Sequence, residues 1–388
     1  MKRARELEEE CGLGGLLRPC YEGRSILNIS ESLLGHYGVD SAKGLGFDPF
    51  GTRKGIALIL MDSLGFDLLV GCARDVGIAK LISRLGIEPL TSTFPSATAT
   101  ALATVCTALP PARHGIVGGL VFIRRLGLVA NMLQLSSIAD PRRDSLLSLG
   151  VKGEELMKGR TVFERLEGIR CYAMSRRQIS DTGISRLVYR GADKLGFISP
   201  SDMFVRMRKL LDEGVFVFAY WDALDPIIHE YGLGEEACAE VGSFLRAMKE
   251  ELLERTDASV VLFGDHGQLE VDEVVEASKL KWLLESVEIP PTGEMRASYI
   301  HPREGYLEQL EDSLSKLELN PMRSDLAVKE GLFGGGGKLL RDRIGELVVL
   351  PSRGKVFYYS YRGGGLKVKG MHGGMEREEM LVPLLFRP

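Results

Sequence analysis

This sequence of 388 residues lacks any apolar run long enough to span a bilayer. The first ten residues are mostly charged, so they lack the apolar segment of a signal peptide. The six cysteines are scattered without a Cys-x-x-Cys pair, which predicts reduced thiols rather than a zinc knuckle or a disulfide framework. We therefore expect a cytoplasmic protein without a membrane anchor.

An excess of positive charge is also missing, because the formal net charge is −4. No overall basic field would attract nucleic acid or a membrane surface, so we expect neither as a partner. Internal repeats are absent as well, and the one low-complexity run is the glycine tract at 334–337. With 45% apolar residues the chain can still fill a large core, as one α/β domain with an insertion or as two domains.

Three continuous apolar runs predict strands that are buried on both faces, as in a parallel sheet. These runs lie at 56–61, 215–220 and 259–263. Amphipathic patterns predict helices at 66–85, 200–211 and 235–255. This alternation predicts an α/β fold with a mostly parallel central sheet flanked by helices.

The pattern changes late in the chain. Residues 291–368 hold a helical stretch at 307–317, the glycine tract and a strand-like end at 346–350. We predict that 291–368 forms a small inserted cap over the sheet. Residues 1–290 together with 369–388 would then form the core domain.

Acidic residues and histidines follow each predicted strand, and another histidine lies between glycines near the end of the chain. The set is Asp62, Asp225, His229, Asp265, His266 and His372. Ligands collect at the carboxyl ends of parallel strands. Asp62 alone would fit equally well as the cap of the next helix. Six mixed carboxylates and imidazoles, however, suit two zinc, manganese or iron ions about 4 Å apart.

A second feature is the stretch 91–114, which predicts a helix of small residues after Pro95 that Pro110-Pro111 ends. Ser96 to Thr98 would lie at the start of this helix, where free N–H groups and the helix dipole favour an anion. A hydroxyl at this place can attack a phosphorus or sulfur atom. The alternative is an ordinary Ser or Thr helix cap.

Three motifs follow one another in order: Asp-x-x-x-His at 225–229, Asp-His-Gly at 265–267 and His-Gly at 372–373. With them the chain resembles the alkaline phosphatase superfamily, and within it the type I phosphodiesterase/nucleotide pyrophosphatase branch. The resemblance implies an alkaline phosphatase-like fold and two bound divalent ions. One ion would be held by Asp225, His229 and His372. The other would be held by Asp62, Asp265, His266 and the nucleophile hydroxyl.

Two threonines compete as that nucleophile. Thr93 lies in a Thr-Phe-Pro string like that of many members of the branch, whereas Thr98 has the family's spacing of ten residues before Ala108, which replaces a glycine. We choose Thr98, because it also lies at the predicted helix start. Gly118-Gly119 replace the asparagine that holds a phosphate oxygen in nucleotide pyrophosphatases, which leaves the nucleotide specificity open.

The resemblance implies an enzyme that cleaves phosphodiester or pyrophosphate bonds in a small phosphorylated substrate through a phosphothreonine intermediate. We expect zinc as the metal, with manganese or iron as alternatives. Phosphomonoesters, phosphonates and sulfate esters stay open as substrates, although Cys106 lacks the Cys-x-Pro-x-Arg context of sulfatases. The non-enzymatic alternative is a metal-stabilised binding protein on a retired hydrolase fold. His114 is expected to be structural, and His36 and His301 to be ordinary surface or core residues.

Overall fold

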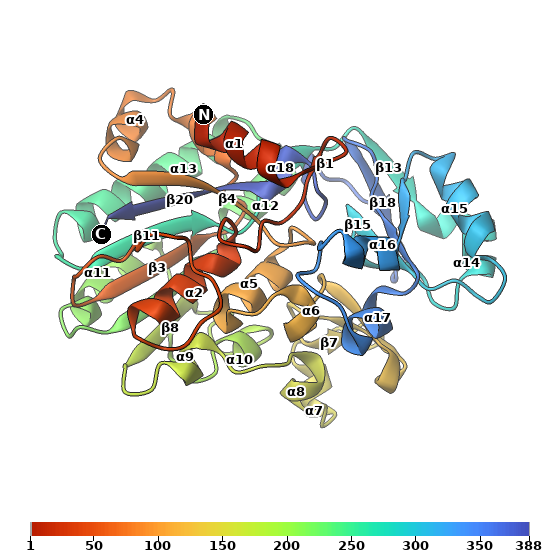
Figure 1. Ribbon diagram of the computed structural model, residues 1–388, viewed down its shortest axis with the longest axis horizontal. Coiled ribbons are helices and arrows are strands. Elements are labelled where there is room, and N and C mark those ends of the chain that lie inside the picture. The colour runs from red at the N-terminus through yellow and green to blue at the C-terminus, as the bar shows by residue number, and fades with distance from the viewer. Residues whose placement is uncertain (1, 388) are drawn as a thin grey trace.

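A seven-stranded sheet forms the centre of the computed structural model, which describes residues 2–387 (Figure 1). In spatial order its strands are β4 (Gly86–Thr91), β20 (Leu381–Arg387), β11 (Ser259–Gly264), β3 (Ile56–Met61), β10 (Phe216–Trp221), β8 (Cys171–Arg176) and β9 (Asp193–Phe197). β20 is antiparallel to both of its neighbours, and the pairs from β11 to β9 are parallel. The predicted mostly parallel sheet is thus confirmed.

The strands have no polar alternation because both faces of the sheet are covered. Every residue of β3 is buried, and its side chains alternate between two hydrophobic cores. Leu58 and Leu60 contribute to one core, whereas Ile59 and Met61 contribute to the other. This two-sided burial explains why the strands are continuous apolar runs in the sequence.

Helices cover both faces of the sheet. One core is shared with α3 (Phe66–Cys72), α4 (Val76–Ile82), α11 (Pro200–Leu211), α12 (Leu224–Tyr231) and α13 (Glu235–Met248). The other is shared with α2 (Ile26–His36), α5 (Thr98–Thr107), α6 (Pro111–His114), α9 (Val162–Arg165) and α10 (Ser185–Val188). The predicted helix at 66–85 is in fact two helices, because Asp75 caps a new helix by accepting a hydrogen bond from the Ile78 N–H.

A second seven-stranded sheet lies beside the first, on the right of Figure 1. Its strands are β16 (Pro321–Arg323), β17 (Leu347–Val349), β15 (Ala297–Ile300), β14 (Thr292–Glu294), β5 (Leu120–Ile123), β6 (Leu128–Asn131) and β7 (Ser136–Ser137). The segment 291–368 therefore shares its sheet with strands from 120–137. A third hydrophobic core joins side chains of this second sheet to side chains of α14 (Lys281–Ser286) and α15 (Leu307–Ser315).

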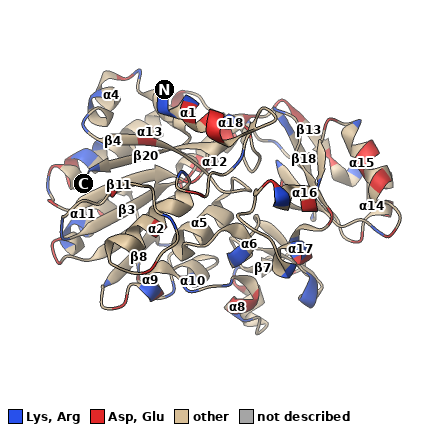
Figure 2. Cartoon of the chain, viewed as in Figure 1, with Lys and Arg blue, Asp and Glu red and all other residues tan. Residues whose placement is uncertain are grey.

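The remaining elements are short or peripheral. The helices are α1 (Lys2–Cys11), α7 (Ser145–Ser148), α8 (Gly153–Leu156), α16 (Ser324–Lys329), α17 (Lys338–Ile344) and α18 (Arg377–Met380). The strands are β1 (Gly12–Leu13), β2 (Leu16–Leu17), β12 (Leu269–Glu270), β13 (Glu273–Glu276), β18 (Lys355–Tyr358) and β19 (Gly370–Met371). Lys and Arg residues are interspersed with Asp and Glu residues along the helices and loops of the molecule (Figure 2).

The cysteines correct one prediction. Cys11 pairs with Cys20 and Cys72 with Cys238, with Cα–Cα distances of 6.0 and 5.1 Å, so the expectation of six reduced thiols is wrong. Sequence spacing did not reveal the Cys72–Cys238 pair, because α3 and α13, which carry these residues, meet only in the tertiary structure. The cytoplasmic location loses its cysteine argument and stays a prediction. Within residues 2–387, no helix is long and apolar enough to cross a membrane.

Candidate metal and active site

The predicted site residues meet at the carboxyl edge of the main sheet. Met61 at the end of β3 is in register with Trp221 of β10 and with Gly264 of β11. Asp62 and Asp265 therefore leave adjacent strands at the same level. The loop after β10 leads into α12, whose first and last turns carry Asp225 and His229.

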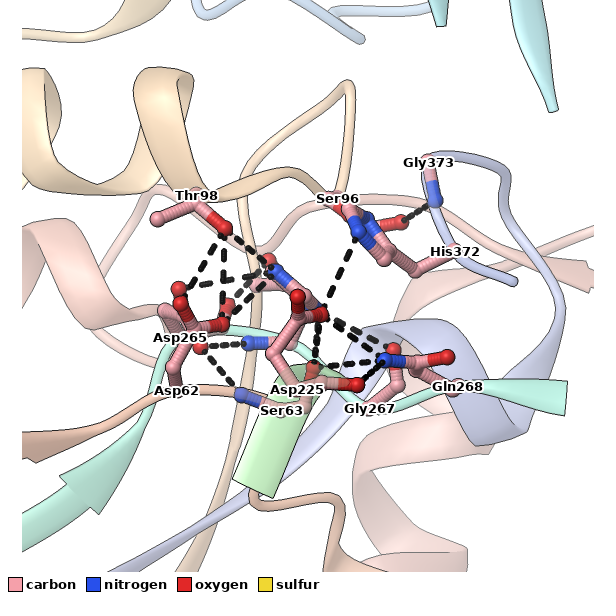
Figure 3. Close-up of polar contacts among 12 residues, drawn as sticks. Asp62, Ser63, Ser96, Thr98, Asp225, Asp265, Gly267, Gln268, His372 and Gly373 are labelled. Carbon is pink, nitrogen blue, oxygen red and sulfur yellow. Dashed lines mark hydrogen bonds and ion pairs between the residues drawn. The ribbon is translucent and has the colours of Figure 1, made fainter. Parts of the chain in front are cut away.

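The first cluster consists of Asp62, Asp265 and His266, which are buried and offer ligand atoms within 4.8 Å of one another. Nε2 of His266 lies 3.4 Å from Oδ1 of Asp62 and 3.5 Å from Oδ2 of Asp265. The Thr98 hydroxyl points into this cluster (Figure 3), 3.2 Å from Nε2 of His266 and 3.4 Å from both Asp62 oxygens. The nucleophile candidate and three ligand candidates are thus side by side.

The second cluster consists of Asp225, His229 and His372, again with ligand atoms within 4.8 Å. Oδ1 of Asp225 lies 3.2 Å from Nε2 of His229 and 3.6 Å from Nε2 of His372. The rings of His372 and His266 stack with their centroids 3.9 Å apart. This stacking makes the two clusters one continuous site.

The three imidazoles share one hydrogen-bonding pattern, in which Nδ1 contacts a backbone carbonyl. Nδ1 lies 3.1 Å from the Gly267 carbonyl in His266, 2.8 Å from the Gly370 carbonyl in His229 and 3.0 Å from the Ser96 carbonyl in His372. A carbonyl oxygen can only accept, so each Nδ1 carries a proton, and in the neutral ring Nε2 is the nitrogen that offers a lone pair. Every one of these lone pairs faces carboxylate oxygens. Histidines that bind metals are held by such backbone contacts.

The donor set fits divalent cations. Oδ2 of Asp265 is buried without a hydrogen-bond partner among the described residues, which is costly for a carboxylate. Burial raises the pKa of Asp265 to about 7, and burial together with the neighbouring Asp265 raises that of Asp62. Carboxylates and the lone pairs of neutral imidazoles repel when they face one another, and a cation between them would convert that repulsion into attraction. The residues of each cluster therefore suit one metal ion.

Three residues that hydrogen-bond to the ligand candidates were not predicted from the sequence. The Ser63 hydroxyl and the Gln268 amide each donate a hydrogen bond of 2.8 Å to Oδ1 of Asp225, and the Tyr220 hydroxyl donates to Oδ2 of Asp62. Ser63 adopts φ 61°, an uncommon backbone conformation for serine. Its position next to Asp62 was the only sequence signal for a supporting role.

The start of α5 distinguishes the two threonines. Thr98 is the first residue of α5, and Ala97 before it is extended. The Thr93 hydroxyl instead donates to the Pro95 carbonyl at 3.0 Å, and the Thr93 side chain is fully buried outside the clusters. Ala108 ends α5 with φ 52°, a conformation that glycine would adopt more easily.

The other three histidines lie outside the two clusters. His114 is buried, with Nε2 at 2.9 Å from the Thr104 hydroxyl and Nδ1 accepting the Ile116 N–H at 3.0 Å. His36 pairs with Asp48, and His301 is buried directly after β15. These contacts hold the fold together rather than a ligand.

One acidic residue that the sequence analysis did not single out reaches toward the site from the second sheet. Glu294, at the end of β14, accepts the N–H of Gly119 through Oε1. Burial raises its pKa to about 7. Gly118-Gly119, where nucleotide pyrophosphatases carry an asparagine, thus border a carboxylate from a distant part of the chain.

Comparisons with known proteins agree with this geometry. The sequence profile of the type I phosphodiesterase/nucleotide pyrophosphatase family matches residues 56–144 and 176–375, which include all seven predicted site residues. A search of curated proteins gave no match.

Solved structures show the same fold at low sequence identity. Murine ectonucleotide pyrophosphatase/phosphodiesterase 5 has 16% identity and a TM-score of 0.62, covering 85% of this chain and 87% of its own. Phosphonoacetate hydrolase from Sinorhizobium meliloti 1021, in complex with phosphonoacetate, has 17% identity and a TM-score of 0.66, covering 88% and 91%. The profile spans more than half of the chain, so the protein belongs to the type I phosphodiesterase/nucleotide pyrophosphatase family of the alkaline phosphatase superfamily and is a phosphoryl hydrolase.

Proposed function

We propose that the protein hydrolyses phosphodiester or pyrophosphate bonds in a small substrate with two divalent metal ions, zinc being the expected metal. Asp225, His229 and His372 would hold one ion. Asp62, Asp265, His266 and the Thr98 oxygen would hold the other. When bound, such ions act as Lewis acids that favour ionisation of a hydroxyl and neutralise phosphoryl charge.

The chain's own groups would carry out two displacements. Oγ1 of Thr98 loses its proton to solvent and attacks phosphorus, while the bond from phosphorus to the leaving oxygen breaks. Water then attacks the phosphothreonine, releases the phosphorylated product and restores the hydroxyl. The N-terminal N–H groups of α5 would face the phosphoryl oxygens during both steps.

The observation that carries this proposal is the position of the Thr98 hydroxyl, within 3.4 Å of Asp62 and His266 at the first residue of a helix. A relative supports it as well. A murine ectonucleotide pyrophosphatase/phosphodiesterase 5 variant with a threonine replaced by alanine is described as inactive, and its structure contains AMP. We carry the role of that threonine over to Thr98.

A second candidate is phosphonate hydrolysis. The phosphonoacetate hydrolase is as similar in fold as the ectonucleotide enzyme, with TM-scores of 0.66 and 0.62. The glycines at 118 and 119 also lack the amide that nucleotide pyrophosphatases use to hold a phosphate oxygen. Both features are compatible with cleavage of a phosphorus–carbon bond.

A substrate panel tests the proposal. Purified protein loaded with zinc or manganese is assayed with bis(p-nitrophenyl) phosphate, p-nitrophenyl phosphate, p-nitrophenyl sulfate and phosphonoacetate. We expect the diester to have the highest kcat/KM. Faster release of phosphate from phosphonoacetate would favour the second candidate, and turnover of sulfate alone or of no substrate would contradict both.

A further inference from the structure

Glu294 has room beside the site because three glycines surround it. A Cβ atom built on Gly119 would lie 3.2 Å from Oε1 of Glu294, and one built on Gly118 would lie 3.5 Å from the same atom. A Cβ atom on Gly373 would lie 2.7 Å from Cβ of Glu294, closer than real Cβ contacts. The His-Gly motif and the Gly-Gly pair therefore leave space for this carboxylate.

This position brings Glu294 beside the loop that carries His372 of the second cluster. Gly373 follows His372 directly, and Glu294 is the nearest residue that a side chain at Gly373 would meet. The carboxylate comes from β14 of the second sheet, whereas His229 lies on a helix that packs on the main sheet. A group bound at Glu294 would thus be next to a phosphorus atom bound at the clusters.

The carboxylate of Glu294 lacks a cationic partner among residues 2–387. Among the residues that the structure describes, its one hydrogen bond comes from the Gly119 N–H to Oε1, so Oε2 is left to accept from a ligand. No Lys or Arg forms an ion pair with it in this part of the chain. A largely buried carboxylate without a cation is unfavourable, and a bound cation would remove this cost.

Glu294 lines a cavity of about 150 Å³. Its lining includes Asn131, Phe357, Tyr358 and Tyr359, and contains no Lys or Arg. Aromatic side chains and a carboxylate attract a small cation, whereas the carboxylate would repel a phosphate group. The volume suits a short substituent rather than a large ring system.

We propose that Glu294 and this cavity bind an ammonium group on the substituent that phosphorus carries, so that zwitterionic phosphodiesters of short amino alcohols are preferred over anionic nucleotide substrates. The inference rests on the proposed phosphodiester hydrolysis and names its substrate class. The Nε2 lone pairs and metals would serve the phosphoryl group, and Oε2 of Glu294 would accept a hydrogen bond from the ammonium group.

Two chromogenic diesters test this preference. 2-Aminoethyl p-nitrophenyl phosphate carries the cation, and propyl p-nitrophenyl phosphate is its uncharged match. We expect a kcat/KM ratio of at least about tenfold in favour of the aminoethyl ester. Glu294→Gln keeps an acceptor for the Gly119 N–H but removes the charge, and should reduce that ratio to about threefold or less. Glu288→Gln, which removes an exposed carboxylate of the same region, should keep the wild-type ratio.

A binding measurement distinguishes failure of the cation site from failure of the proposed diester hydrolysis. The affinities of metal-loaded protein for 2-aminoethyl phosphate and propyl phosphate are compared by calorimetry, which needs no turnover. If neither diester is cleaved but 2-aminoethyl phosphate binds more tightly through Glu294, the diesterase proposal fails and the cation site holds. Equal affinities in the wild type, or a preference that persists in Glu294→Gln, would overturn the cation site whatever the activity.

Discussion

The carbonyl oxygen of Ser96 lies 3.0 Å from Nδ1 of His372. The Ser96 hydroxyl also donates to the Gly374 carbonyl at 2.8 Å and accepts the Gly373 N–H at 3.2 Å. Three contacts thus join the residue two places before Thr98 to the loop that presents His372, as Figure 3 shows in part. These contacts connect the segment just before α5 to a metal-ligand candidate 276 positions further along the chain.

The nucleophile assignment predicts different outcomes for the two threonines. Thr98→Ala should lower kcat by at least about a thousandfold, because it removes the attacking oxygen. Its metal content and circular dichroism should match the wild type, since the other six ligand candidates remain. Thr93→Ala should lower kcat much less, because Thr93 only donates to the Pro95 carbonyl. Phosphate trapped on Thr93, found by mass spectrometry, would show that Thr98 is the wrong choice.

Metal binding should depend on the cluster residues. We expect elemental analysis to find about two zinc, manganese or iron ions per chain, given one cluster for each ion. Asp225→Asn should lose about one of them, because Asp225 is the only carboxylate of its cluster. His36→Ala is the control and should lose none, since His36 contacts Asp48 on the surface. Metal-free protein that metal addition does not activate would count against the two clusters as metal sites.

His114 should make stability depend on pH. Burial lowers its pKa from 6.5 to about 3, so the unfolded chain takes up a proton that the folded protein does not. Its stabilising contribution is complete above about pH 6.5 and is lost as pH falls from there toward 3. Between pH 7.5 and 5.5, His114 should account for about 1.4 kcal/mol of lost unfolding free energy.

The measurement is denaturant unfolding of the wild type and of His114→Asn at both pH values. The variant will be less stable overall, because the hydrogen bonds to Thr104 and Ile116 change. The informative quantity is the difference between the two pH values. If that difference is the same in both proteins, His114 is not the titrating group.

The disulfides predict a thiol count and a stability loss. Unfolded without a reductant, the protein should show two reactive thiols, Cys106 and Cys171. Cys72→Ser and Cys238→Ser should each lower the unfolding free energy by about 2–5 kcal/mol, because a link across 166 positions restricts the unfolded chain. The double variant should lose little more than either single one. Six reactive thiols in protein purified under air would refute the pairing.

The local sequence pattern was sufficient to predict the buried strands and the ends of several elements. Strand β3 and helix α11 begin and end where the apolar pattern and Ser199 predicted, because burial and capping act on neighbouring residues. The position of Asp62 next to Asp265 was also predictable. Parallel strands in register bring their carboxyl ends to one edge, so residues that follow them must be close.

Contacts between segments that are not neighbouring parallel strands could be found only from the tertiary structure. The Cys72–Cys238 pair depends on how α3 packs on α13, and the position of Glu294 depends on how the second sheet meets the His372 loop. Tyr220 is an ordinary strand residue in the sequence, and only the strand order aims its hydroxyl at Asp62. The sequence by itself determined which residues follow the strands at the carboxyl edge of the main sheet, because the apolar pattern sets where each strand ends. Packing between helices and sheets that are distant in the sequence determined which side chains hydrogen-bond to the site residues and which residues of the second sheet face them. These contacts arise only when the core is complete, because they join segments that have no fixed spacing along the chain.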